Sequence, residues 1–179
     1  SSKPITLPLK KSCTFSGESY RSANYLKAGI AAKINSRAKG QTGEREVADM
    51  LNAAVFRATG VYGDFKRNLS QTQDGGFDLE SEVYPFFAIE VKRVEAITNA
   101  VLEKFWEQTT RQASLFAPPG KYLLPVLIYR KSRNPWRIRT IGRPMWADTT
   151  FCPIEISEPD FIVWFENQIK AVNEKRKER

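Results

Sequence analysis

Three residues, Asp78, Glu90 and Lys92, have the types and spacing of a site for metal-assisted hydrolysis of a phosphodiester bond. Asp78 follows the glycine pair Gly75-Gly76, and Glu90 and Lys92 follow the apolar run 86–89. Charged side chains at the end of a buried strand carry a large desolvation penalty, which a bound cation would offset. We therefore expect a metal site at this position.

The alternation of side chains along a strand predicts how this site is built. Residues two apart on a strand point to the same face, so Glu90 and Lys92 should share one face while Ile89 and Val91 pack on the other. Asp78, on the preceding strand, can then approach Glu90. Carboxylate oxygens of both residues and the main-chain carbonyl of Val91 form a hard oxygen site suited to Mg²⁺ or Mn²⁺. Lys92 would hold the attacking water and stabilise the transition state.

A plainer interpretation remains open for the same residues. Asp78 could cap a turn, and Glu90 and Lys92 could pair on an exposed edge strand. An aspartate followed twelve residues later by Glu-x-Lys is by itself a weak pattern.

The amino-acid composition excludes several classes of catalytic mechanism and of metal site. The chain of 179 residues has a net charge of +8 and no histidine, which excludes every mechanism with a histidine base. Its two cysteines, Cys13 and Cys152, cannot form an ordinary zinc site without histidine, and we expect them to be free thiols. The positive charge favours a polyanionic partner, either nucleic acid or an anionic membrane surface. The sequence has no apolar run of spanning length and no signal-peptide pattern, so we expect a cytoplasmic, soluble protein.

The positive charge is concentrated at the start of the chain. Residues 1–39 contain eight Lys or Arg and one acid, whereas the remainder is close to neutral. We expect residues 1–38 to form a basic arm, partly extended and partly helical over 22–35, that lies on a phosphate backbone. The alternative is a solvated tail. Residues 39–179 should form one domain.

Hydrophobic periodicity predicts the elements of that domain. Thr42 should cap a helix that ends at Thr59 before Gly60, and Ser157 should start the C-terminal helix. Pro125 in an apolar strand requires an unpaired amide position or a bulge. Residues 142–156 have no clear assignment. The other predicted elements are strands over 64–69, 77–83, 86–93, 122–129 and 136–141, and a helix over 98–115.

The motif Gly76-Phe77-Asp78 followed by Glu90-Val91-Lys92 resembles the PD-(D/E)xK nuclease superfamily, with Phe77 in place of the usual proline. The predicted order of elements over 42–130 is similar to the superfamily core. The segment 39–45 resembles the first-helix signature of Holliday junction resolvases, and 125–137 is similar to phage-encoded resolvase-like nucleases.

The first-helix resemblance assigns a further metal ligand to Glu44, with Glu46 as the alternative if the alignment is shifted. A glutamine on the helix after the lysine often lines such sites. Gln108 is the candidate, and Gln112, one turn later, is its rival.

The resemblance implies an α/β, restriction-endonuclease-like core (αβββαβ) with a mixed central sheet flanked by helices. It implies a Mg²⁺-dependent endonuclease, with Mn²⁺ able to substitute and no small-molecule cofactor. The expected substrate is branched DNA such as Holliday junctions, and two symmetric incisions imply a homodimer. The alternatives are a restriction- or repair-type nuclease on duplex or flapped DNA, a nuclease acting on RNA, and a non-catalytic DNA-binding protein on a nuclease fold.

Basic residues near the motifs could contact phosphates, although each one singly could be a solvated surface charge. The predicted DNA-binding residues are Lys33, Arg37, Lys39, Arg45, Arg67, Arg93, Arg111, Arg130 and Lys131.

Overall fold

The computed structural model describes the backbone of residues 18–69, 76–142 and 151–178, and the side chains of these ranges from residue 38 onward. Contacts divide the chain into two units, Ser1–Arg37 and Ala38–Arg179. In the first unit the described residues are helical and belong to helix α1 (Glu18–Thr59). The rest of the predicted arm, residues 1–17, lies outside the described residues. The second unit contains the sheet and the other helices.

Helix α1 does not begin at Thr42, and the predicted N-cap is wrong. The helix runs without a break from Glu18, and the hydroxyl of Thr42 donates a hydrogen bond to the carbonyl of Ala38 over 2.9 Å. A threonine inside a helix commonly bonds back to the carbonyl four residues earlier, so it need not stop the helix. The predicted end is confirmed, because the helix stops at Thr59 and Gly60 has a φ of +77°.

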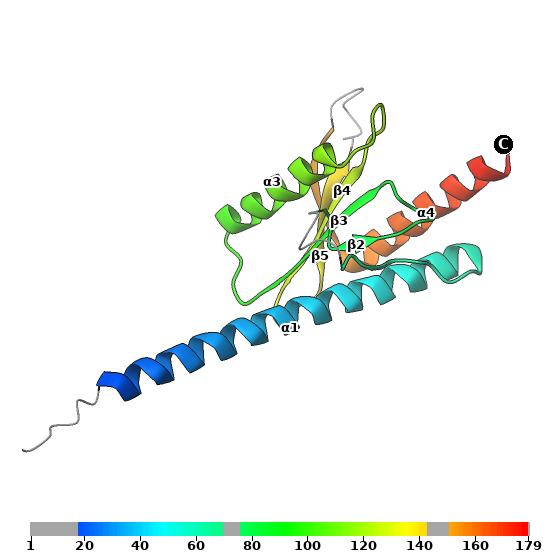
Figure 1. Ribbon diagram of the computed structural model, residues 1–179. Helices are drawn as coiled ribbons and strands as arrows, with labels where there is room; N and C mark the ends of the chain where they lie inside the picture. Colours follow the sequence, from blue (N-terminus) through cyan, green and yellow to red (C-terminus); the bar gives the residue numbers. More distant parts are fainter. Residues whose placement is uncertain (1–17, 70–75, 143–150, 179) are drawn as a thin grey trace, which may run out of the picture. The chain divides into compact units, whose positions relative to one another are not determined.

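The second unit is built on a mixed sheet of six strands in the described part of the chain, in the order β1-β2-β3-β4-β5-β6 (Figure 1). Strands β3 and β4 are parallel, and every other neighbouring pair is antiparallel. With helices on both faces, this is the restriction-endonuclease-like α/β fold that was expected. The strands are β1 Lys66–Arg67, β2 Leu79–Glu80, β3 Phe87–Val94, β4 Leu124–Lys131, β5 Arg137–Gly142 and β6 Cys152–Ser157.

The two faces of the sheet pack against different helices. One face, with Ile89 and Ile128, packs against residues 38–59 of α1 and against α4 (Glu158–Lys177). The other face, with Leu127 and Tyr129, packs against α3 (Asn99–Leu115). Figure 1 shows α3 and α4 on opposite sides of the strands. A residue of β3 or β4 therefore faces α3 or the α1–α4 side according to its parity.

The starts of α3 and α4 agree with the sequence. The side chain of Thr98 accepts from the amide of Val101 and caps α3, and that of Ser157 accepts from the amide of Asp160 and caps α4. The described residues include no helix that is both long and apolar enough to span a membrane. Cys152 is a free thiol, and Cys13 lies outside the described residues.

Strands β1 and β2 are shorter than predicted, because Asp64 turns the chain after Glu80. Its carboxylate accepts hydrogen bonds from the amides of Glu82 at 2.7 Å and Val83 at 3.0 Å, and from the hydroxyl of Ser81. These amides are therefore not available to a strand ladder. The predicted strand 77–83 is reduced to Leu79–Glu80 for this reason.

Strand β6 is the element that the sequence did not predict. It pairs with β5 over its whole length, from Arg137 opposite Ser157 to Gly142 opposite Cys152. Pro153 lies within it, which an edge strand tolerates because one row of its amides has no partner strand. Ile154 and Ile156 alternate with polar residues, and this alternation was the available signal. Pro125, in β4, lies just before the pairing with β5 begins at Val126, and its carbonyl accepts from the Thr140 hydroxyl.

Candidate active site

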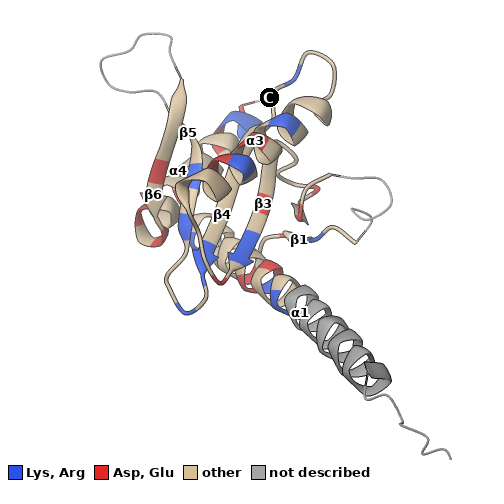
Figure 2. Cartoon of the chain, turned by 90° about the vertical axis from the view of Figure 1, so that its left-hand side faces the viewer, with Lys and Arg blue, Asp and Glu red and all other residues tan. Residues whose placement is uncertain are grey.

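Strand β3 places Glu90 and Lys92 on the face of the sheet that α3 covers. Their neighbours Ile89 and Val91 belong to the core on the opposite face, as the alternation predicted. Figure 2 shows acidic and basic positions next to each other along β3. Glu90 is completely buried, and the Lys92 side chain is 22% exposed.

Asp78 is held against β3 by the backbone. Its amide donates to the carbonyl of Ile89 over 3.1 Å, and its Oδ2 accepts from the amide of Val91 over 2.7 Å. Gly76, two residues earlier, has a φ of +111°, a conformation that residues with a side chain rarely adopt. The glycine before the aspartate is therefore required by the turn that leads Asp78 into the site.

The ammonium group of Lys92 lies between the two carboxylates. It donates to Oε1 of Glu90 and lies 3.6 Å from Oδ2 of Asp78. Burial alone would lower the pKa of Lys92, but the charges of Asp78 and Glu90 outweigh it and raise this pKa above its ordinary value. Lys92 is therefore held as a cation.

One carboxylate oxygen of Glu90 accepts hydrogen bonds, and the other has no hydrogen-bond partner. Its Oε1 accepts from Lys92 and, over 3.2 Å, from Nε2 of Gln108 on α3. Its Oε2 is buried and has no hydrogen-bond partner. Burial, and then the negative charge of Asp78, raises the pKa of Glu90 to about 7 against the opposing effect of Lys92. A buried carboxylate oxygen without a partner is costly, and a cation beside it would remove that cost.

The structure distinguishes Glu44 from Glu46, both on α1. Glu44 pairs with Arg67, and its charge is the smallest of the effects that raise the pKa of Glu90. Glu46 instead pairs with Arg130 and lies 3.4 Å from Arg93. No spacing in the sequence indicated that Arg67, on β1, would be the partner of Glu44.

The predicted acidic ligands are not gathered into one compact cluster. Within the described residues, no group of three Asp, Glu or Cys side chains is close enough to hold a metal ion. Glu44 is turned to Arg67, and Lys92 lies between Asp78 and Glu90. The donor set nevertheless fits a hard cation, since it offers carboxylate oxygens and includes the unpartnered Oε2 of Glu90.

Gln108 is the glutamine that reaches the site. Gln112, its predicted rival, has a buried Oε1 without a hydrogen-bond partner, and the glutamine hydrogen-bonded to Glu90 is Gln108. Trp106 and Trp136 are both buried in the core, on opposite faces of the sheet, as expected for packing residues.

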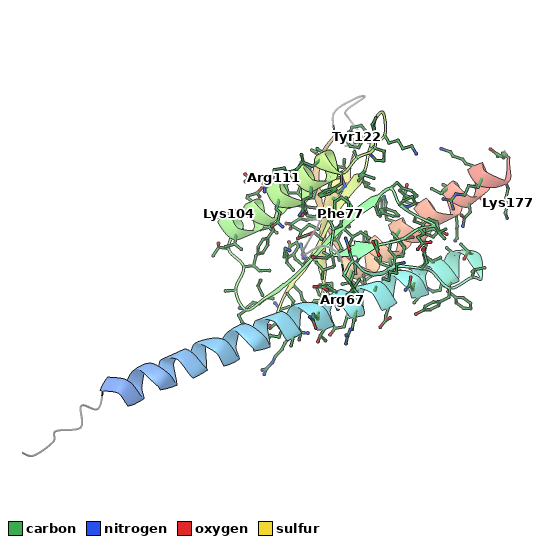
Figure 3. The ribbon with its side chains drawn as sticks, in the orientation of Figure 1. Arg67, Phe77, Lys104, Arg111, Tyr122 and Lys177 are labelled. Carbon is green, nitrogen blue, oxygen red and sulfur yellow. The ribbon has the colours of Figure 1, made fainter. Side chains whose placement is uncertain are left out.

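Several predicted phosphate-binding residues are engaged by acids. Arg67 pairs with Glu44 and lies over α1 (Figure 3). Arg93 and Arg130 flank Glu46, and the guanidinium of Arg130 stacks 4.1 Å from the ring centroid of Trp136.

The other predicted basic residues are more open. Lys39 is half exposed and pairs with Glu95. Arg45, Arg111 and Lys131 are exposed and have no ion pair within the described residues. The side chains of Lys33 and Arg37 lie outside the described residues.

The fold and the Asp78, Glu90 and Lys92 arrangement together define a restriction-endonuclease-like nuclease core. A family model described as "Phage putative PDDEXK endonuclease" matches residues 35–150, which is more than half of the chain. The chain therefore belongs to this family of PDDEXK nucleases. Nucleases of this class generally use divalent metal ions. No curated protein and no solved structure matches the chain.

Proposed function

We propose that this protein is a Mg²⁺-dependent endonuclease that hydrolyses phosphodiester bonds of DNA. The observation that carries the proposal is the buried Oε2 of Glu90, which has no partner and lies beside Asp78 and Lys92. A protein that only bound DNA would have no need of this costly arrangement. Membership in the PDDEXK family and the net charge of +8 support the same conclusion.

The ligands would be the carboxylates of Asp78 and Glu90 and the carbonyl of Val91. Glu44 would become a further metal ligand once its ion pair with Arg67 is broken. Mn²⁺ should replace Mg²⁺, because both ions prefer oxygen ligands. A metal ion bound there supplies charge neutralisation at the phosphate and lowers the pKa of a bound water.

The chain's own residues orient the reacting groups. Lys92, held as a cation by two carboxylates, would position the attacking water and stabilise the extra negative charge of the transition state. Gln108 fixes Oε1 of Glu90, so that Oε2 is the oxygen left for the metal. Asp78 is itself oriented by the amide of Val91, which donates to its Oδ2.

We further propose that the preferred substrate is branched DNA, such as a Holliday junction, cut by a homodimer. The support is the similarity of residues 39–45, which include Glu44, to the first helix of junction resolvases. Two symmetric incisions across a junction require two active sites, which a twofold dimer would supply. The basic residues 1–39 would add attraction for the DNA backbone.

One cleavage assay tests the proposal. Labelled four-way junction, flap, linear duplex, single-stranded DNA and RNA are incubated with the protein, with and without Mg²⁺ or Mn²⁺. Asp78→Asn and Lys92→Ala are the variants, because each removes one charge of the site, and thermal melts establish that each variant is folded. We expect metal-dependent cutting by the parent protein and a loss of at least about a hundredfold in each variant.

The outcomes separate the alternatives. Binding without cleavage under both metals would refute the enzyme proposal and favour a DNA-binding protein. Equal cutting of linear duplex and junction would refute the junction preference and leave a restriction- or repair-type nuclease. A monomer at the working concentration, measured by light scattering with the junction bound, would refute the dimer.

A further inference from the structure

A basic hollow lies where strands β3 and β4 end, apart from the candidate active site. It has a volume of about 620 Å³ and is lined by Lys39, Arg93, Glu95, Ser132 and Arg133. Lys39 comes from α1, Arg93 from β3 and Glu95 from just after it, and the other two from the turn after β4. The hydrogen bond from the amide of Ser132 to the carbonyl of Val94, 2.9 Å long, holds the two strand ends together. We call these five lining residues the basic hollow.

The carboxylate of Glu95 is surrounded by donors in this hollow. The ammonium of Lys39 pairs with it, the hydroxyl of Ser132 donates to it, and the charge of Arg133 acts on it. Lys39, then Ser132 and then Arg133 lower the pKa of Glu95. Glu95 is 68% exposed, so this carboxylate can leave the hollow without unfolding its surroundings.

The charges in the basic hollow do not balance. Three cations, Lys39, Arg93 and Arg133, face the single acid Glu95. Arg93 also lies 3.4 Å from Glu46, but its Nε is buried and has no hydrogen-bond partner. A phosphodiester offers charged acceptor oxygens that could engage Lys39, Arg133 and the Ser132 hydroxyl together, in place of the carboxylate of Glu95.

Arg133 is placed at the tip of the turn by an uncommon backbone conformation. Its φ of +68° is left-handed, and residues other than glycine seldom adopt it. The turn closes with a hydrogen bond from the amide of Asn134 to the carbonyl of Lys131, 2.9 Å long. A tight, closed turn fixes the backbone of Arg133 at the edge of the hollow, and the exposed side chain lines the hollow.

We propose that the basic hollow binds a backbone phosphate of the DNA substrate, and that Glu95 occupies this phosphate position until DNA displaces it. The inference rests on the proposed function, because it supplies the substrate. The basic hollow would be a second DNA-binding site, formed by residues outside the Asp-Glu-Lys motif.

The hollow and the candidate active site lie on opposite sides of β3. Glu90 and Lys92 face α3, whereas Arg93 packs beside Gly43 of α1. A phosphate held in the hollow would therefore belong to a part of the DNA other than the scissile bond.

Equilibrium binding to a labelled junction, without metal and across a series of salt concentrations, tests this inference. Lys39→Gln and Arg133→Asn remove one charge each, and asparagine tolerates the left-handed backbone at position 133. Each should weaken binding by about tenfold at 0.1 M salt and reduce the slope of log K against log salt by about 0.9. Lys177→Gln, at the end of α4 (Figure 3), removes the same charge elsewhere and is the control.

Removing the negative charge of Glu95 gives a second test, in which DNA binding should become tighter. Glu95→Gln should tighten binding several-fold, whereas Glu174→Gln on α4 should not, although both remove one negative charge. A series of junctions with single methylphosphonate linkages should show one position where neutralising the phosphate no longer matters in the Lys39→Gln variant. Melting temperatures confirm that each variant is folded.

The results distinguish the two proposals. If the parent protein cuts DNA but the variants in the hollow bind like the Lys177→Gln control, the phosphate site is refuted and the nuclease function stands. If the variants in the hollow bind more weakly but the parent protein never cuts, the phosphate site stands and the nuclease function fails. Equal tightening by Glu95→Gln and Glu174→Gln would refute the specific role of Glu95.

Discussion

Gln108 on α3 donates its amide hydrogen to Oε1 of Glu90 on β3 over 3.2 Å. This contact joins the helix that covers the sheet to the most deeply buried carboxylate of the site. Because Lys92 shares the same oxygen, Oε2 is left as the oxygen without a partner. The orientation of Glu90 therefore depends on two donors from different elements.

Replacing Gln108 by alanine should lower the cleavage rate by about tenfold. The carboxylate of Glu90 would lose one of the donors that orient it, and a misplaced ligand weakens catalysis without abolishing it. Gln112→Ala is the matched control on the same helix and should leave the rate within about twofold, because Gln112 does not contact Glu90. Single-turnover rates with saturating enzyme measure both. A larger loss in Gln112→Ala than in Gln108→Ala would contradict this prediction.

The stability of the metal-free protein should fall as the pH rises from about 4.5 to about 7. Burial, with the charge of Asp78, raises the pKa of Glu90 to about 7 in the folded protein from 4.5. Between these values the folded state binds a proton that the unfolded state has released, so raising the pH favours unfolding, by at most about 3 kcal/mol. Lys92 loses its proton only at higher pH, outside this window.

The measurement for the pH prediction is the urea-unfolding free energy with chelator at pH 5 and pH 8. The loss of stability between the two should be larger in the parent protein than in Glu90→Gln, which cannot ionise at this position. The chain has no histidine, so no histidine contributes to the change. Added Mg²⁺ should restore stability at pH 8 more than at pH 5, because ligands must be deprotonated. Equal pH dependence in both proteins would show that Glu90 titrates normally.

Glu44 and Glu46 should behave differently when each is changed to glutamine. Glu44→Gln should reduce cleavage by about a hundredfold and weaken Mn²⁺ binding measured by calorimetry, because the proposed function makes Glu44 a metal ligand. Glu46→Gln should leave Mn²⁺ binding unchanged. It would instead free Arg93 and Arg130 from their acid partner. The reverse result would show that the first-helix ligand is Glu46.

Replacing Gly43 or Gly63 by alanine should change the stability of the protein in opposite directions. A Cβ added at Gly43 would meet the ring of Trp136 at 3.4 Å and the side chain of Arg93 at 3.5 Å, which are ordinary contacts. Gly43→Ala should therefore stabilise the protein by up to about 1 kcal/mol, since glycine disfavours a helix interior. At Gly63 a Cβ would meet Asn52 at 2.6 Å and its backbone at 3.1 Å, so Gly63→Ala should destabilise it. Thermal melts of the two variants measure both signs.

Features within a few residues of each other in the sequence were enough to predict the elements that carry the site. The alternation along β3 placed Glu90 and Lys92 on one face, and the capping residues Thr98 and Ser157 marked the two helix starts. Gly60 marked the end of α1. These features depend on neighbours within a few residues, which a sequence displays directly. The PD-(D/E)xK motif led to the family for the same reason.

Other features depended on residues far apart in the chain. Thr42 was expected to start a helix because it is a good capping residue, but the segment before it continues the helix. The short strand β2 depends on Asp64, which is 17 residues from Ser81. The partner of Glu44 is Arg67, 23 residues away, and no spacing pattern links the two.

The sequence by itself therefore determined the residue types of the site, the faces they occupy on β3 and the nuclease class. Only the tertiary structure decided that Gln108 reaches Glu90, that Glu44 pairs with Arg67 while Glu46 pairs with Arg130, and that Lys39 meets Glu95. The physical reason is that strand alternation and helix capping are local, whereas ion pairs between elements depend on how the sheet brings their ends together.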